Sequence, residues 1–301
     1  MSSIHVQKIT KKFGSQIAVN DVSFDVDGGE IFGLLGPNGA GKTTAIRIIL
    51  DIFKPDSGSV SILDGPMNEE KKNHIGYLPE ERGLYQDIQL ERCLVYLATL
   101  KGLDTATAQA RINVFLERFE LEPWRKKKVK ELSKGMQQKA QLITTLVHQP
   151  EIIVIDEPFS ALDPVNTQMV KDLLREQRES GKTIIMCTHQ MHQVEELCDR
   201  LVLIDKGQTM LYGTLQDVRH QFAKPAVSVS TPDSLPESLP GVDSISSENG
   251  DYTLHLLPGM LPQEVLQSLI KTNIQIDKFE ISMPTLDEIF IEVVKKQEAV
   301  Q

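Results

Sequence analysis

The chain has 301 residues and a mass of 33.7 kDa, a length that predicts about two domains. Hydrophobic residues make up 40% of it and charged residues 25%, which is ordinary for a globular protein and argues against full disorder, a collagenous repeat or a coiled coil. The net charge of −10 argues against a protein that binds nucleic acid over its whole surface, so no nucleic-acid partner is expected.

Hydropathy and cysteine usage predict a cytoplasmic protein. The longest unbroken apolar run, Cys93–Ala98, is much shorter than the roughly 20 residues that a transmembrane helix needs. The N-terminal residues lack the apolar core and the cleavage site of a secretory signal. The three cysteines, at positions 93, 187 and 198, have no metal-site spacing and fit free thiols in a reducing compartment.

Along the first part of the chain, strand-like and helical segments alternate. The pattern predicts a helix at 42–53 and strands at 4–10, 17–26, 31–35, 59–63, 75–78, 152–155, 183–187 and 200–205. Between the fifth and sixth of these strands, apolar residues recur at helix spacing, which predicts an inserted helical subdomain at about 88–148. The alternation favours a mostly parallel sheet with helices packed around it.

The last part of the chain differs in charge and in pattern. Residues 223–301 contain 12 acidic and 5 basic residues, and so carry most of the net negative charge. The stretch Ser230–Gly241 is rich in Pro and Ser and predicts a loop or linker. A small α+β module is predicted, with strands at 227–230, 244–246, 252–257 and 274–281 and helices at 262–270 and 285–294. We therefore place a domain boundary near residue 222.

A glycine-rich loop between a predicted strand and a predicted helix is the strongest motif. It reads GPNGAGKT and matches the pattern G-x-x-x-x-G-K-[ST]. Glycines let several backbone N–H groups point at one anion, and the helix N-terminus adds a positive dipole end. Lys42 adds a charge for the phosphates, and the Thr43 hydroxyl suits Mg²⁺. The predicted nucleoside triphosphate site comprises Gly36, Pro37, Asn38, Gly39, Ala40, Gly41, Lys42, Thr43 and Thr44.

This loop alone leaves kinases, GTPases and transport ATPases open, and two further segments narrow the choice. Asp156 and Glu157 end an apolar strand, where Asp156 fits a metal-coordinating acid and Glu157 fits the group that orients or activates the attacking water. Ser133 and Gly135 lie at the start of a helical stretch, where a hydroxyl and backbone donors predict a second phosphate-binding edge. Taken singly, the first segment also fits a strand that ends in a charged turn, and the second an ordinary capped helix.

The order of the motifs resembles that of the ATPase subunits of ATP-binding-cassette (ABC) transporters. After the P-loop come Leu132–Gln138, Asp156–Glu157, Ser160–Asp163 and His189, and the resemblance covers roughly residues 4–222. It implies an α/β fold of the P-loop NTPase class: an ABC cassette with a mostly parallel sheet, antiparallel N-terminal strands and an inserted helical subdomain. A small C-terminal α+β accessory domain at 223–301 would follow the ATPase domain at 1–222.

The resemblance also implies roles for residues around the nucleotide. Phe13 stands where the family has the aromatic residue that stacks on adenine, and a phenyl face can do the same. Glu80 stands where glutamine is usual and implies a third metal ligand beside Thr43 and Asp156. His189 matches the histidine that contacts the γ-phosphate, and so joins Glu157 as a catalytic residue.

Further residues are implied to act between two copies of the chain. Ser133 and Gly135 match the segment that closes over ATP held by the P-loop of a second copy, although Lys134 and Met136 depart from the family pattern. Asp163 ends the loop that communicates between the two nucleotide sites. The implied partners are therefore a second ATPase copy, forming a homodimer, and integral membrane permease subunits at the cytoplasmic face of the cell membrane.

The implied activity is hydrolysis of ATP, with Mg²⁺, to power transport. Residues 79–85 (PEERGLY) and 284–290 resemble the branch of simple bacterial exporters similar to sodium-export ATPases, which favours export. The alternative is an ABC-type ATPase that acts on ribosomes or DNA, and a third reading is a P-loop kinase of small molecules. The transported substrate is left open.

Overall fold

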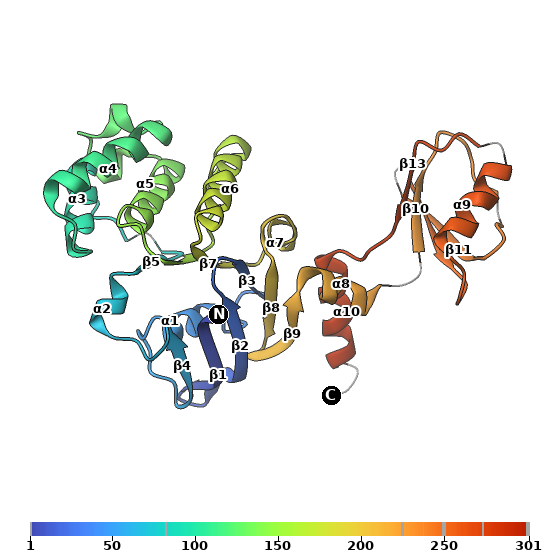
Figure 1. Cartoon of the computed structure of the whole chain (residues 1–301), viewed down its shortest axis with the longest axis horizontal. Coiled ribbons are helices and arrows are strands. Elements are labelled where there is room, and N and C mark those ends of the chain that lie inside the picture. The colour runs from blue at the N-terminus through green and yellow to red at the C-terminus, as the bar shows by residue number, and fades with distance from the viewer. Residues whose placement is uncertain are drawn as a thin grey trace. The chain divides into compact units, whose positions relative to one another are not determined.

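The computed structural model describes residues 2–81, 83–223, 226–236, 238–248, 251–272 and 274–298. The chain forms two compact units, Met1–Leu215 and Gln216–Gln301 (Figure 1), a division on the N-terminal side of the boundary placed near residue 222. Arg82 and Glu237, which fall within predicted segments, lie outside the described residues. Nowhere in the described ranges is a helix both long enough and apolar enough to cross a membrane.

The first unit contains two sheets. One has three antiparallel strands in the order β2-β1-β4, and the other has six strands in the order β5-β6-β7-β3-β8-β9. Neighbours in the second sheet are parallel except for the antiparallel pair β8 and β9, so the predicted mostly parallel sheet and antiparallel N-terminal strands are confirmed. The strands are β1 (Ser2–Phe13), β2 (Gln16–Asp27), β3 (Ile31–Leu35), β4 (Ser57–Ile62), β5 (Ile75–Leu78), β6 (Ile152–Asp156), β7 (Thr183–Thr188), β8 (Arg200–Asp205) and β9 (Gln208–Thr214).

The sequence analysis missed β9. Its residues are half-buried or exposed, so it shows neither a clean alternation nor a continuous apolar run. What makes it a strand is its pairing with β8, which is a tertiary contact and not a local preference.

Helices surround the six-stranded sheet and form the inserted block. They are α1 (Lys42–Ile49), α2 (Glu69–Lys72), α3 (Leu90–Leu100), α4 (Thr105–Arg118), α5 (Lys134–Leu146), α6 (Pro164–Glu179) and α7 (Met191–Leu197), with short 3-10 helices η1 (Glu122–Trp124) and η2 (Val129–Glu131). The helix predicted at 42–53 ends early, at Ile49, because Asp51 has a φ of 60°, which an α-helix does not contain. Gly102, with a φ of 85°, separates α3 from α4 in the same way.

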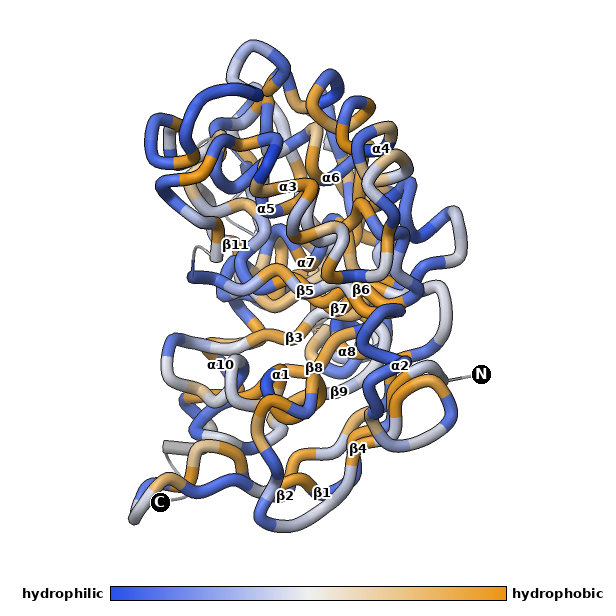
Figure 2. Tube along the Cα trace, turned by 90° about the vertical axis from the view of Figure 1, so that its left-hand side faces the viewer, coloured by the Kyte–Doolittle hydropathy of each residue, from blue (hydrophilic) through white to orange (hydrophobic). Residues whose placement is uncertain are grey.

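The centre of the first unit is made by β3, β6 and β7. Every residue of these three strands is buried, as expected for parallel strands covered on both faces. Hydrophobic segments of the chain trace gather around the same strands in Figure 2. Because the three strands are parallel neighbours, their carboxyl ends lie side by side at one edge of the sheet.

In its described residues, the second unit contains an antiparallel sheet and three helices, the first of which is α8 (Leu215–Phe222). The strand order is β11-β12-β10-β13, and Val227, Leu254, Val265 and Leu269 are fully buried members of its apolar core. The stretch Ser230–Gly241 is a loop inside this unit, and the strand predicted from residue 274 begins at Lys278. The other elements are β10 (Ala226–Ser230), β11 (Val242–Glu248), β12 (Asp251–Leu256), α9 (Pro262–Lys271), β13 (Lys278–Ile281) and α10 (Leu286–Glu298).

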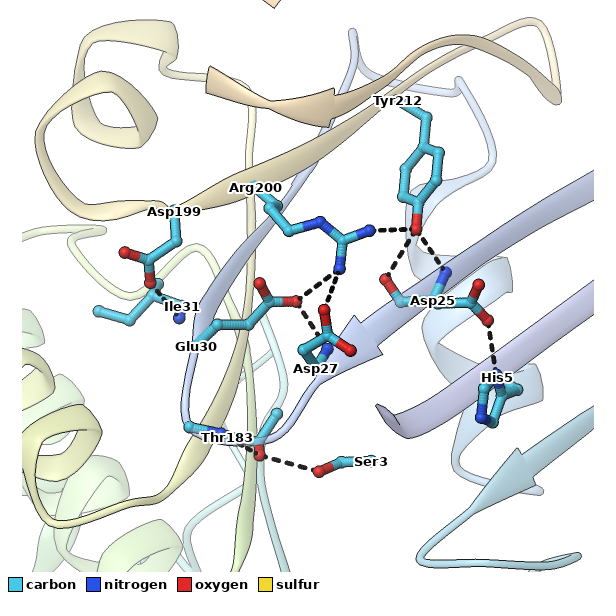
Figure 3. Close-up of polar contacts among 11 residues, drawn as sticks. Ser3, His5, Asp25, Asp27, Glu30, Ile31, Thr183, Asp199, Arg200 and Tyr212 are labelled. Carbon is cyan, nitrogen blue, oxygen red and sulfur yellow. Dashed lines mark hydrogen bonds and ion pairs between the residues drawn. The ribbon is translucent and has the colours of Figure 1, made fainter. Parts of the chain in front are cut away.

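A partly buried polar contact joins the two sheets of the first unit. Arg200, at the start of β8, donates to Asp27 at 2.9 Å and to Glu30 at 3.3 Å, and its other terminal nitrogen donates to the hydroxyl of Tyr212 (Figure 3). Glu30 is only 8% exposed, and burial raises its pKa despite the hydrogen bond from the backbone N–H of Asp27. The guanidinium therefore supplies the cation for a carboxylate that water reaches poorly.

We expect Arg200→Leu to lower the free energy of unfolding by about 2–3 kcal/mol, because Glu30 then stays buried without the cation that it contacts. Urea unfolding followed by circular dichroism at pH 7 measures this. The loss should shrink at a pH low enough to protonate Glu30. Arg178→Leu is the matched control, since Arg178 and Asp199 are 33% and 42% exposed and such a pair contributes about 0–1 kcal/mol. Equal losses in the two variants would contradict this account of the contact.

Candidate nucleotide site

The glycine-rich loop connects β3 to α1 and is shaped by close backbone contacts. A Cβ atom at Gly36 would lie 2.0 Å from the carbonyl oxygen of Ile204, and one at Gly41 would lie 2.3 Å from that of Ala18. Gly41 also has a φ of 106°, a conformation that residues with a Cβ rarely adopt. Sterics therefore require glycine at these two positions, because the loop backbone lies close to β8 at Gly36 and close to β2 at Gly41.

Lys42 begins α1 and turns its side chain back over the loop. Its ammonium donates to the carbonyl oxygens of Gly36 at 2.8 Å and Pro37 at 3.0 Å, and the residue is only 7% exposed. The charge is thus held at the centre of the loop. A phosphate group beside the loop would meet this ammonium together with the free N–H groups of the helix N-terminus.

A pocket of about 430 Å³ opens beside this loop. Most of the predicted nucleotide and metal residues line it, namely Phe13, Asn38, Gly39, Gly41, Lys42, Thr43, Thr44, Glu80, Asp156 and Glu157. Gln16 and Ala18 also line it and were missed by the sequence analysis. The signal for them was the Gly14-Ser15 turn, because the hairpin register places Gln16 directly opposite Phe13.

Phe13 offers an aromatic surface at the mouth of the pocket. Its side chain is 46% exposed and packs edge to face on Phe53, with ring centroids 5.5 Å apart. The ammonium of Lys11 lies 5.8 Å from the ring centroid. An exposed ring that is fixed by a second ring is a suitable platform for stacking a base.

Thr43 and Asp156 bring two oxygen ligands together at the floor of the pocket. The Thr43 hydroxyl donates to Oδ2 of Asp156 at 3.2 Å, and Asp156 is only 2% exposed. Burial raises the pKa of Asp156, while hydrogen bonds from Cys187 and Thr43 act in the opposite direction. A buried carboxylate with an adjacent hydroxyl fits Mg²⁺, which binds through one or two carboxylates, water and substrate phosphates. In the described part of the chain, no group of three or more His, Cys, Asp or Glu residues could hold a metal ion.

Glu157 follows Asp156, and hydrogen bonds hold its side chain against Thr188 and His189 at the end of β7. Its Oε1 lies 2.6 Å from Nδ1 of His189 and accepts from the backbone N–H of His189 at 3.0 Å, while Oε2 accepts from the hydroxyl of Thr188 at 3.2 Å. A carboxylate only accepts, so Nδ1 of His189 carries the hydrogen in this contact. The φ of 52° at Glu157 turns the chain at this point. The structure thus joins the two predicted catalytic residues in one contact.

Seven predicted residues do not line this pocket. Gly36, Pro37 and Ala40 belong to the glycine-rich loop beside it, and His189 contacts Glu157. The other three lie at two helix N-termini. Ser133 caps α5, with Oγ accepting from the backbone N–H of Met136 at 3.2 Å. A Cβ atom at Gly135 would lie 2.9 Å from the carbonyl oxygen of Ala161, so the start of α5 lies against the segment that leads to Asp163. Asp163 caps α6, and its hydrogen bonds from Asn166 lower its pKa.

The sequence was compared with known families and proteins. Residues 19–160 match the family described as ABC transporter, and residues 213–294 match the family described as ATP-binding protein DrrA1-3-like, C-terminal domain. The chain is 40% identical to the uncharacterized ABC transporter ATP-binding protein YhaQ of Bacillus subtilis (strain 168), over 96% of this chain and 97% of the relative. The chain belongs to the ABC transporter ATP-binding proteins. The resemblance to ATPase subunits of ABC transporters, inferred from the motifs, is therefore confirmed.

Other relatives and solved structures agree with this membership. The Nod factor export ATP-binding protein I of Burkholderia lata is 36% identical over 71% of each chain. A solved structure titled as the ATP binding subunit of an ABC transporter has a TM-score of 0.69 and 33% identity, covering 73% of this chain and 93% of that one. The cbiO1 protein of Clostridium perfringens, described as part of the cbiONQ transporter complex, has a TM-score of 0.63 and 25% identity over 73% of this chain and 92% of its own.

Members of this family are ATPases that bind ATP and power transport together with membrane permease components. The predicted fold class and ATP hydrolase activity are confirmed by this membership, and the relatives favour a transporter subunit over the ribosome- or DNA-acting alternative. The roles of the individual site residues stay predictions.

Asp156→Asn is expected to raise the stability of the protein measured without nucleotide or metal at pH 7. Because burial raises the pKa of Asp156, its stabilising contribution is complete below about pH 4 and is lost as the pH rises through the raised pKa. Asparagine stays neutral, so the difference between the variant and the wild type in the melting temperature should grow from pH 4 to pH 8.

Asp163→Asn is the matched control for this measurement. Hydrogen bonds lower the pKa of Asp163, so its ionised form is favoured in the folded protein and its neutralisation should not raise stability at pH 7. An Asp156→Asn variant that melts below the wild type at pH 7 would show that other contacts outweigh the desolvation of the carboxylate.

Proposed function

We propose that this chain is the ATPase subunit of an ABC exporter and that its pocket binds Mg²⁺ and ATP. The observation that carries the proposal is the pocket of about 430 Å³ in which the P-loop, Thr43, Asp156 and Glu157 converge. Export is supported by the names of relatives such as the Nod factor export protein and by the DrrA-like match of residues 213–294. We assign the ATPase domain to residues 1–222 and an accessory domain to 223–301.

The proposed binding mode uses the groups that line the pocket. Phe13 stacks on the base, and the residues of the P-loop from Gly36 to Thr44 surround the phosphates, with Lys42 supplying the positive charge. Thr43 and Asp156 hold Mg²⁺, and Glu80, which lines the same pocket, adds a third oxygen ligand. When bound, the ion neutralises negative charge on the β- and γ-phosphates.

Glu157 is the proposed base for the attacking water. Its carboxylate lines the pocket and is oriented by Thr188 and by the backbone and ring of His189. Release of the ring nitrogen from Glu157 would free a carboxylate oxygen for water and let His189 reach the γ-phosphate. Phosphoryl transfer depends mainly on such positioning and on electrostatic stabilisation.

A second copy of the chain is the proposed source of the remaining phosphate contacts. Ser133 is exposed at the N-terminus of α5, a 13-residue helix, and neither Ser133 nor Gly135 lines the pocket of its own chain. A helix N-terminus favours an anion. We propose that the α5 N-terminus and Asp163 of each copy meet the nucleotide held by the other, in a homodimer docked on permease subunits at the cytoplasmic face of the membrane.

Glu157→Gln should lower the rate of ATP hydrolysis by about 10²–10³-fold, because an amide does not accept the proton of the attacking water. Phosphate release by the purified protein with its permease measures the rate, and equilibrium binding of a fluorescent ATP derivative measures affinity. Binding should stay within a few-fold of the wild type. Unchanged turnover would remove Glu157 from the catalytic role.

Ser133→Asp tests the contact between copies in the Glu157→Gln background. Aspartate caps a helix as well as serine does, so α5 should keep its start, but the added charge would repel the phosphates of the second copy. Light scattering with ATP and Mg²⁺ should show a dimer for Glu157→Gln alone and a monomer when Ser133→Asp is added. Ser133→Asn, a neutral cap of similar size, should keep the dimer. Loss of the dimer in both variants, or in neither, would argue against a phosphate contact at Ser133.

A further inference from the structure

Cys187 lies beside the carboxylate that we assign to the metal. In the parallel pair of β6 and β7, Asp156 and Cys187 are direct register partners. Side chains of such partners leave the sheet on the same face. Asp156 is 2% exposed and Cys187 is 0% exposed, so the two groups meet where water does not compete for their hydrogen bonds.

The register places the thiol of Cys187 next to the carboxylate of Asp156, on the same face of two hydrogen-bonded strands. A cysteine thiol ordinarily carries its hydrogen at neutral pH and can donate it, whereas a carboxylate only accepts. The Thr43 hydroxyl also donates to Asp156, through Oδ2 at 3.2 Å. A hydroxyl has one hydrogen and two lone pairs, so Thr43 can donate to Asp156 and still turn a lone pair to a metal ion.

We propose that Cys187 is a positioning residue whose S–H group holds the Asp156 carboxylate in the orientation in which it meets the metal ion. This inference rests on the proposed function, in which Asp156 and Thr43 hold Mg²⁺. Groups behind a metal ligand orient it, and their loss typically weakens metal binding by about 10–100-fold. A thiol is a weak donor, so the effect of Cys187 lies at or below the lower end of that range.

Cys187 also contacts Glu157, but through its backbone and not through its side chain. The carbonyl oxygen of Cys187 accepts from the backbone N–H of Glu157 at 2.9 Å, a contact that any substitution of the side chain leaves in place. Side-chain variants of Cys187 therefore test the thiol and not the path of the strand. Serine keeps a donor at the same position, whereas alanine removes it.

The experiment measures the affinity for a fluorescent ATP derivative as a function of Mg²⁺ concentration, in the Glu157→Gln background so that hydrolysis does not interfere. Cys187→Ala should raise the Mg²⁺ concentration for half-maximal enhancement about three- to tenfold, with nucleotide affinity in EDTA unchanged. Cys187→Ser should stay within about twofold of the parent, because its hydroxyl donates to Asp156. Should Cys187→Ala not fold, Cys187→Val removes the donor with a side chain that suits a buried strand.

Cys198→Ala is the matched control. Its thiol is also buried, 7% exposed at the end of α7, and packs near Gly33 and not at Asp156. The Cys198→Ala substitution should not change the Mg²⁺ dependence of nucleotide binding. An unchanged Mg²⁺ dependence in Cys187→Ala, or equal changes in the alanine and serine variants, would overturn the role of the thiol.

Asp156→Asn separates this inference from the proposed function. If Asp156→Asn abolishes the Mg²⁺ dependence while Cys187→Ala does not alter it, the metal site stands and the role of Cys187 is wrong. If Asp156→Asn leaves the Mg²⁺ dependence as in the parent, the assignment of the metal to Asp156 fails, and the role of Cys187 fails with it.

Discussion

The site depends on one buried carboxylate, that of Asp156, at the end of a strand that is otherwise apolar. Ile152–Ile155 are fully buried, and their burial carries Asp156 to a position with 2% exposure. The fold therefore keeps an ionisable group where its charge is poorly solvated, as the raised pKa of Asp156 records. A buried carboxylate is stabilised most by a nearby cation. In the proposed function, the same burial that lowers the stability of the protein alone would therefore favour binding of a metal with the nucleotide.

Parallel strand order explains how motifs far apart in the sequence reach this carboxylate. β6, β7 and β3 are consecutive in the sheet, so the residues after each strand meet at one edge. β3 leads to the P-loop, β6 to Glu157 and β7 to His189. The contacts that result, Thr43 with Asp156 and His189 with Glu157, join residues 113 and 32 positions apart. The position of ligand sites at the carboxyl ends of strands follows from this arrangement.

The sequence analysis predicted the parts of the site that short local motifs specify. The P-loop and the Asp156-Glu157 pair each follow a run of apolar residues that had to be a buried strand, and the structure places both in the pocket. Gln16, Ala18 and the role of Cys187 depend on which residues face each other across strands, and one sequence does not specify that register. The sequence analysis missed the strand β9 because its pairing with β8 defines it. It missed the early end of α1 because a single residue, Asp51, takes a left-handed conformation there.

The contacts within the site also imply that ligand binding exchanges partners and does not merely add them. Lys42 donates to the carbonyl oxygens of Gly36 and Pro37, and Glu157 accepts from His189 and Thr188. In the proposed function, a γ-phosphate that draws Lys42 and His189 toward itself would release together the carbonyls that follow β3 and the carboxylate of Glu157, which follows β6. The affinity for nucleotide is therefore the difference between two sets of hydrogen bonds. In the proposed function, this exchange would link the release of Glu157 to the arrival of the γ-phosphate, because His189 would contact first one and then the other.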